Sequence, residues 1–342
     1  MGYIQNAWYA AAWSSEVGEQ FLTRTLLEIP ILLYREGTRI VALHDQCPHR
    51  FAPLSLGSRV DGLIRCGYHG LSFDSSGHCI KSLFSPVAPK AAKVRAFPIH
   101  EQDRMVWIWM GTLPAADVAT IPRLAFHTDA ALRCQFGYTH AKADYRLLSD
   151  NLMDLTHTAL LHPAFGGLDY IPAYKCWEAD GQVFSQYIIE HMPSFLAPGS
   201  AELLHNHDTI RWIAPATHCL ESCITLDDGK GATVRIPSAH ILTPETATTS
   251  HYFWSSGTPA GTAASDEDMR ALLVQAFDHE DKPMIEAVQR RMGTTELWDL
   301  NPILLNTDGG SVRVRRRIDA LIAAEQAQRN ASSDNPTATT PA

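Results

Sequence analysis

The sequence has 342 residues and a formal net charge of −9, with 45% hydrophobic and 19% charged residues. This apolar content is enough for a large core, and the length predicts two domains of ordinary size. The negative charge disfavours binding to nucleic acid or to an anionic membrane surface. The chain has no apolar run of about 18 residues and no secretory signal pattern, so we expect a cytoplasmic protein without a membrane span.

Residues 1–115 are predicted to form an all-β domain. Apolar stretches are interrupted at Glu36-Gly37 and at Ser75-Ser76-Gly77, and both interruptions are typical of hairpin turns. The segment "MVWIWMG" adds a strand rich in Trp and Val that ends before Gly111. The proline-containing stretch that follows is predicted to be the connector between two domains.

Residues 116–328 mix helical and strand patterns. Helical spacing covers 145–161, 265–292, where Ser265 and the acidic residues after it form a favourable N-terminus, and 311–328. Strand patterns near 183–191, 209–226, 233–243 and 246–256 predict an antiparallel sheet covered by these helices. The polar tail 329–342 is predicted to be disordered. The fold class is therefore α+β, with an all-β N-terminal domain and a mixed C-terminal domain.

Two short loops carry interleaved metal ligands, in the order Cys47-x-His49 and Cys66-x-x-His69, with 16 residues between the pairs. A zinc site usually groups like ligands, so a Cys₂His₂ zinc site is the weaker alternative. One thiolate and one imidazole from each loop suit two metal atoms, with both thiolates on one and both imidazoles on the other. A Rieske [2Fe–2S] cluster has this arrangement. The seven cysteines are also an odd number, which argues against a disulfide framework.

The motifs "CPHR" and "CGYHG", with "NAWY" and "VWIWMG", resemble the Rieske non-haem iron oxygenases, and within them the vanillate and dicamba O-demethylase type. The resemblance extends over nearly the whole chain. It implies a Rieske domain at 1–115 and a catalytic domain with a mononuclear Fe(II) at 116–328. A Rieske domain alone can be an electron carrier, so the rest of the chain decides between electron transfer and catalysis.

The segment "DNLMDLTHTALLHP" contains His157 and His162, which lie five residues apart. A regular helix would place them about 140° apart, too far round to face one ion. Pro163 disfavours helical geometry at His162, so this histidine is expected where the helix ends or distorts. A 2-His-1-carboxylate site for iron would then need one distant acidic residue.

The late helix offers several carboxylates, and the sequence does not choose between Asp278, Glu280, Asp281 and Glu286. The family resemblance points to Asp281. By the same resemblance, Asp154 is not an iron ligand but an electron-transfer bridge to the cluster of a neighbouring subunit, and Asn151 lies near the iron.

The family resemblance also predicts the activity. A ferredoxin or an NAD(P)H-dependent reductase would reduce the cluster, and O₂ would be activated at the iron of a homotrimer. The expected reaction is oxidative O-demethylation of a small methoxylated aromatic such as a methoxybenzoate. Methyl or ring hydroxylation and N-dealkylation are the alternatives. The segment "HILTPET" resembles the corresponding segment of these relatives, and this resemblance implies that His240 binds substrate, with Glu221 as a further candidate at the pocket.

Overall fold

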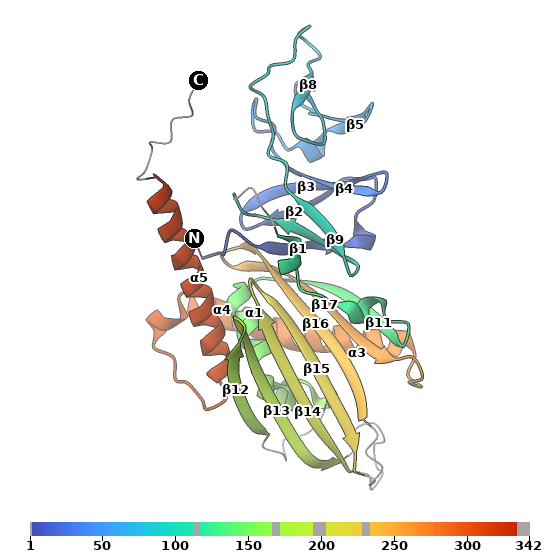
Figure 1. Ribbon diagram of the computed structural model, residues 1–342, viewed down its shortest axis with the longest axis vertical. Coiled ribbons are helices and arrows are strands. Elements are labelled where there is room, and N and C mark those ends of the chain that lie inside the picture. The colour runs from blue at the N-terminus through green and yellow to red at the C-terminus, as the bar shows by residue number, and fades with distance from the viewer. Residues whose placement is uncertain (1, 113–116, 166–171, 194–202, 228–232, 334–342) are drawn as a thin grey trace. The chain divides into compact units, whose positions relative to one another are not determined.

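A computed structural model describes residues 2–112, 117–165, 172–193, 203–227 and 233–333 of the chain (Figure 1). It contains two compact units. The smaller unit comprises 8–123 and 243–246, and the larger unit comprises 1–7, 124–242 and 247–342. The domain boundary expected between residues 115 and 116 falls at a stretch outside the described residues.

The smaller unit consists of three antiparallel sheets, with strand orders β1-β10-β9, β2-β3-β4 and β5-β6-β7-β8. Its strands are β1 (Trp8–Trp13), β2 (Leu22–Leu26), β3 (Ile29–Glu36), β4 (Arg39–His44), β5 (Ser58–Val60), β6 (Leu63–Arg65), β7 (Ser72–Phe73), β8 (Cys79–Lys81), β9 (Ile99–Gln102) and β10 (Met105–Trp109). Both predicted hairpins are present. Gly77 has φ +83°, and a Cβ there would lie 2.0 Å from the Val94 carbonyl oxygen, so this turn requires glycine.

The core of the smaller unit includes the two cysteines of the interleaved motifs. Cys47 and Cys66 are packed in one cluster of buried residues with Leu32, Tyr34, Val41, Leu43, Leu54, Ile64, Leu71, Phe73 and Val94. The strands that precede the two loops therefore supply apolar residues on one side of the cysteines. This packing holds the loops to the sheets and limits the positions that the two sulfur atoms can take.

The larger unit is built on one seven-stranded antiparallel sheet of order β11-β17-β16-β15-β14-β13-β12 (Figure 1). Its strands are β11 (Leu132–Ala141), β12 (Ala173–Ala179), β13 (Gln182–Pro193), β14 (Leu203–Ile213), β15 (Thr217–Leu226), β16 (Thr233–Thr246) and β17 (Thr249–Pro259). The first ten residues of β16 lie in the larger unit, and its last four residues belong to the smaller one. The sheet is a long, regular surface on which side chains alternate between two faces.

Helices pack on one face of this sheet, which we call the inner face. They are α1 (Tyr145–Met153), α2 (Thr158–Leu161), α3 (Asp266–Val274), α4 (Lys282–Met292) and α5 (Gly309–Ser333). The Tyr187 hydroxyl of β13 donates to the Met153 carbonyl at the end of α1, and Thr139 of β11 donates to Asp278 after α3. No helix in the described part of the chain is both long and apolar enough to cross a membrane.

The α+β fold class is confirmed, and the differences concern how elements are divided. The predicted strand 209–226 is two strands, β14 and β15, and strands β11 and β12 were not predicted. The predicted helices 145–161 and 265–292 are each interrupted, at positions that carry site residues. The last helix continues to Ser333, so residues 329–333 of the tail expected to be disordered are helical.

Candidate metal centres

The two Cys/His loops follow β4 and β6 in the smaller unit. The Cys47 amide donates to the Ala52 carbonyl, and the Cys66 amide donates to the Leu71 carbonyl, both at 2.8 Å. The Gly70 amide donates to the Cys66 carbonyl at 3.0 Å. Each loop is therefore closed on itself by backbone hydrogen bonds, which fix the direction of its cysteine.

The four predicted cluster ligands form a set with two different ends. Cys47 and Cys66 are 1% and 3% exposed, whereas His49 is exposed and His69 is half-buried. The rings of His49 and His69 lie side by side, with centroids 4.6 Å apart. Burial raises the pKa of the Cys47 thiol to about 11, and a hydrogen bond with the Cys66 thiol adds to the shift. The sulfur end thus faces the core and the imidazole end faces outward.

The residues present fit a Rieske cluster. The Nδ1 atom of His69 is buried and has no hydrogen-bond partner among the described residues, and a bound metal would explain such an orphaned nitrogen. Cys47 and Cys66 are both free cysteines in the structure, and cysteine side chains bind a metal as thiolates. Two sulfurs at one end and two imidazoles at the other match a [2Fe–2S] cluster whose irons have unlike ligands.

In the larger unit, two interruptions of the helix at 145–161 orient the histidines. Helix α1 ends at Met153. The next residue, Asp154, has φ −120° and ψ 97°, and its side chain accepts from the Thr156 amide of the next turn. After a 3₁₀ turn at Leu155–His157 and the short α2, the chain leaves helical geometry at His162, with φ −118° and ψ 74°. The exit at His162 was expected from Pro163, but the break at Asp154 was not predicted.

A second irregularity orients the carboxylate. Residues Gln275–Asp281 form a π-helical turn between α3 and α4, and the Lys282 amide donates to the Phe277 carbonyl five residues earlier. A π turn is wider than an α turn, so it changes the direction in which side chains at its end project, and such turns are frequent at functional sites. Asp281, the last residue of the turn, is buried.

These irregular segments bring three metal-ligand side chains together. The Asp281 Oδ1 atom lies 3.4 Å from His157 Nε2 and 3.2 Å from His162 Nε2. One ligand atom from each of the three residues lies within 4.8 Å of the others. Two imidazoles and one carboxylate on one side of an ion leave other positions open, as in non-haem Fe(II) oxygenases.

The second nitrogen of each histidine is held by an acceptor. His157 Nδ1 lies 2.6 Å from the Asp154 carbonyl oxygen, and His162 Nδ1 lies 2.7 Å from Glu280 Oε2. If both Nδ1 atoms carry the proton, both Nε2 lone pairs face Asp281. Asn151 Nδ2 also donates to Asp281 Oδ1, at 3.2 Å. Such outer hydrogen bonds orient metal ligands and set the tautomer.

The carboxylates considered from sequence occupy different places. Asp281 faces both histidines, and Glu280 faces the far nitrogen of His162. Asp278 accepts from the Thr139 hydroxyl at 2.6 Å, away from the Nε2 atoms. Glu286 accepts from the Lys142 amide at 2.9 Å. The geometry therefore favours Asp281 as the third ligand and assigns Glu280 a supporting contact that sequence reasoning missed.

The two imidazoles have different electrostatic surroundings. Burial lowers the pKa of His157, which favours the neutral form that binds a metal. Burial acts in the same direction on His162, but its hydrogen bonds to Asp281 and Glu280 outweigh burial and raise its pKa. A bound cation would replace the proton that His162 shares with these carboxylates.

Asp154 lies at the edge of a depression of about 320 Å³ that Asn151 and His157 also line. Its Oδ1 accepts from Thr156 and Tyr187, and its Oδ2 accepts from the Thr307 hydroxyl at 3.0 Å. Thr307 is 153 residues away, and no sequence pattern indicated it. Three hydrogen bonds thus hold the Asp154 carboxylate in a depression that His157 also lines.

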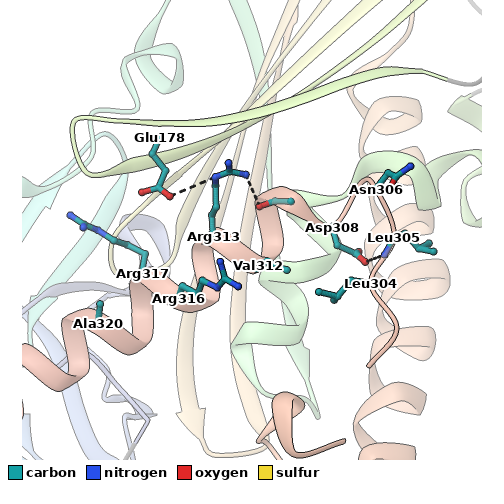
Figure 2. A pocket seen from close by; sticks show the side chains of 11 residues that line it. Glu178, Leu304, Leu305, Asn306, Asp308, Val312, Arg313, Arg316, Arg317 and Ala320 are labelled. Carbon is teal, nitrogen blue, oxygen red and sulfur yellow. Dashed lines mark hydrogen bonds and ion pairs between the residues drawn. The ribbon is translucent and has the colours of Figure 1, made fainter. Parts of the chain in front are cut away.

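A larger depression of about 640 Å³ adjoins the first and shares Leu304, Asp308 and Val312 with it. Figure 2 shows Arg313 on α5 between Glu178 and the Gly309 carbonyl oxygen, with Arg316 and Arg317 along the same helix. This surface combines exposed leucines with arginines.

His240 lies on β16 and is buried against the π turn. Its Nδ1 lies 2.6 Å from the Tyr252 hydroxyl, and its ring meets the Phe277 ring edge-on at a centroid distance of 5.4 Å. Burial lowers the pKa of His240 to about 4, so the ring is neutral at pH 7. Its Nε2 has no hydrogen-bond partner in the described part of the chain. This buried nitrogen lies beside the turn that carries Asp281, and it is available for a hydrogen bond with a ligand.

Glu221 is not brought together with His240. On β15 it lies three residues from His218, which pairs directly with His240, so the side chains of Glu221 and His240 project from opposite faces of the sheet. The Glu221 carboxylate is exposed and forms an ion pair with Arg235 at 2.5 Å. This position gives no support to the predicted pocket role of Glu221.

Comparison with known proteins identifies both parts of the chain. Residues 7–98 match the Rieske [2Fe-2S] domain, and residues 141–324 match the vanillate O-demethylase oxygenase C-terminal domain. The chain is 37% identical to the oxygenase component of dicamba O-demethylase from Stenotrophomonas maltophilia, over 96% of this chain and 100% of that protein. It is 36% identical to the oxygenase component of chloroacetanilide N-alkylformylase from Rhizorhabdus wittichii, over 94% and 97%.

A solved structure of dicamba monooxygenase with non-haem iron and dicamba superimposes with a TM-score of 0.82, at 35% identity, and covers 96% of this chain and 100% of that one. The family matches and the two sets of candidate metal-binding residues agree on the kinds of cofactor. The chain therefore belongs to the Rieske non-haem iron oxygenases, as an oxidoreductase that carries a Rieske [2Fe–2S] cluster and a mononuclear iron.

Proposed function

We propose that this protein is the terminal oxygenase of an O-demethylase, acting on a small methoxylated aromatic carboxylate with electrons from a ferredoxin or an NAD(P)H-dependent reductase. The overall reaction consumes the methoxy compound, O₂, two electrons and two protons. It yields the phenol, formaldehyde and water. The observation that carries the proposal is the convergence of His157, His162 and Asp281 in a chain 37% identical to a dicamba O-demethylase component.

In this proposal Cys47, His49, Cys66 and His69 hold the cluster, and His157, His162 and Asp281 hold the iron. When bound, the cluster supplies electrons and the iron supplies O₂ activation. The protein itself fixes the ligands. The Asp154 carbonyl oxygen accepts from His157 Nδ1, and the Glu280 carboxylate accepts from His162 Nδ1. These contacts keep both Nε2 atoms available to one ion.

We assign Asp154 the role of bridge to the cluster of a second copy in a homotrimer. Two exposed apolar surfaces support this assembly. One surrounds the cluster loops, with Phe51 69% and Tyr68 64% exposed, and the other follows α4, with Ile303 91% and Leu305 67% exposed. Unlike surfaces that meet head to tail form a closed ring when the rotation between neighbouring copies closes, as it does at 120° for a trimer. Sedimentation equilibrium should give three times the mass of one chain, and a monomer at micromolar concentration would refute the assembly.

His240 is assigned to substrate binding. Tyr252 is buried, which raises its pKa well above its usual value, so its hydroxyl keeps its proton at pH 7. When this hydroxyl donates to His240 Nδ1, the ring carries its proton on Nε2. The Nε2–H group then donates to a carboxylate or phenol oxygen of the substrate.

N-dealkylation is the second candidate, because the chain is also 36% identical to a chloroacetanilide N-alkylformylase component. The test is a turnover screen of methoxybenzoates and N-alkyl anilides with a surrogate reductase and NADH. Formaldehyde and the matching phenol in equal amounts support O-demethylation. Release of a dealkylated amide or aniline without any phenol product would refute it in favour of N-dealkylation.

A further inference from the structure

The inner face of the large sheet carries an amide oxygen and a carboxylate oxygen, two residues apart on one strand, that are buried and accept no hydrogen bond in the described part of the chain. They are Oδ1 of Asn206 and Oδ1 of Asp208, both on β14. The other polar atoms of this pair are used. Asn206 Nδ2 donates to Asp208 Oδ2 at 2.7 Å, and the Ser222 hydroxyl also hydrogen-bonds Asp208. Buried polar atoms without a partner are rare in folded proteins and need an explanation.

Both residues face the side of the sheet that carries the metal-ligand segments. Asp208 pairs in register with Tyr187 of β13 and with Ser222 of β15. The Tyr187 hydroxyl lies 3.0 Å from the Met153 carbonyl oxygen and 3.3 Å from Asp154 Oδ1, so this row of side chains points toward the end of α1. Asn206, Asp208 and His240 therefore share one face of the sheet.

The Asp208 carboxyl group is also electrostatically unusual. Burial raises its pKa, although hydrogen bonds from Ser222 and Asn206 act in the opposite direction. No lysine or arginine in the described part of the chain forms an ion pair with Asp208. A buried carboxyl group without a cationic partner destabilises the fold, and such groups are concentrated at functional sites.

We propose that Asn206 and Asp208 are specificity residues of the active site, which accept hydrogen bonds from a hydroxyl or amino group on the aromatic ring of the substrate. This inference rests on the proposed function and adds to it: the substrate carries a donor at the end of the ring away from His240. Two acceptor oxygens side by side match an O–H or N–H donor and repel a carboxylate. The substrate carboxylate is therefore directed to His240.

The separation between His240 and Asp208 is compatible with a substrate that has one aromatic ring. From His240 to Asp208 the sheet extends about 13 Å along the strands and about 10 Å across them at ideal geometry. Two inward-pointing side chains and one doubly substituted ring can span this separation. The pair thereby selects the orientation in which the methoxy group is presented to the iron ligands.

Calorimetry on the anaerobic holoenzyme tests the proposal with 3-methoxybenzoate as the parent probe, beside its ring-hydroxylated and ring-aminated derivatives. We expect at least one donor-bearing derivative to bind the wild type roughly tenfold to a hundredfold more tightly than the parent, as expected for a buried hydrogen bond. Asp208→Leu and Asn206→Leu should remove this preference. Asp180→Asn, a carboxyl change in an exposed turn of the same sheet, should keep it.

Thermal unfolding of the Asp208→Leu variant tells whether Asp208 recognises the substrate or only stabilises the fold. We expect Asp208→Leu to unfold at the wild-type temperature or above, because it removes an unpaired buried carboxyl group. A lower unfolding temperature with an unchanged donor preference would mean a structural role and overturn the inference. Equal binding of the parent and all derivatives would overturn it as well, even where formaldehyde is released. Donor-dependent binding that needs Asp208 but yields no formaldehyde would refute the demethylase assignment and leave the inference standing.

Discussion

The two proposed sets of metal ligands are built in opposite ways. The cluster ligands lie within 23 residues, from Cys47 to His69, on two loops that hold themselves by backbone hydrogen bonds. The proposed iron ligands are spread from His157 to Asp281 and depend on a helix break and a π turn. A local site is readable in the sequence because spacing alone defines it. A site made by helix irregularities depends on the tertiary structure.

The largest effect is expected from removing one ligand of each set. His157→Ala should abolish turnover and lower the iron content from about three to about two atoms per chain, with the Rieske absorption spectrum intact. Cys66→Ser should do the reverse, with loss of the cluster colour while the mononuclear iron is retained. Iron analysis with visible spectroscopy measures both. Loss of both metals in either variant would contradict two independent sites.

A smaller effect is expected at Asp154. Asp154→Asn keeps the backbone carbonyl that holds His157, so both metals should remain while turnover falls roughly 100-fold. Thr307→Val is the matched control, because it removes one hydrogen bond to Asp154 and keeps the carboxylate. Turnover near the wild-type rate in Asp154→Asn would exclude the bridging role.

The smallest effect is expected from Glu280. Glu280→Gln removes the charge beside His162 Nδ1, and the dissociation constant for Fe(II) should rise roughly tenfold. Asp278→Asn alters the neighbouring carboxyl group in the same π turn, which bonds Thr139 and no histidine, so its iron affinity should stay at the wild-type value. Equal losses in the two variants would mean that the turn, and not the contact with His162, holds the iron. Titration of the apoprotein with Fe(II) measures the difference.

Features of this molecule that depend on local sequence pattern could be predicted from the sequence. The hairpins, the cluster ligands and the end of the helix before Pro163 follow from turn residues and spacing. Asp281 was selected over its neighbours only by family resemblance, because the sequence pattern of a regular helix does not show which of several nearby carboxylates faces the histidines. The roles of Glu280 and Thr307 depend on contacts across 118 and 153 residues, which no local pattern encodes.

The π turn at Gln275–Asp281 has a consequence for the comparison of relatives. A π turn is equivalent to an α-helix with one residue inserted, and it keeps the flanking helices α3 and α4 in their own positions. A homologue without this turn would align with a one-residue gap between 275 and 281. Such a gap would mark a chain in which the residue equivalent to Asp281 is rotated away from the two histidines, so one missing residue in an alignment would indicate the loss of oxygen chemistry in a chain that keeps the fold.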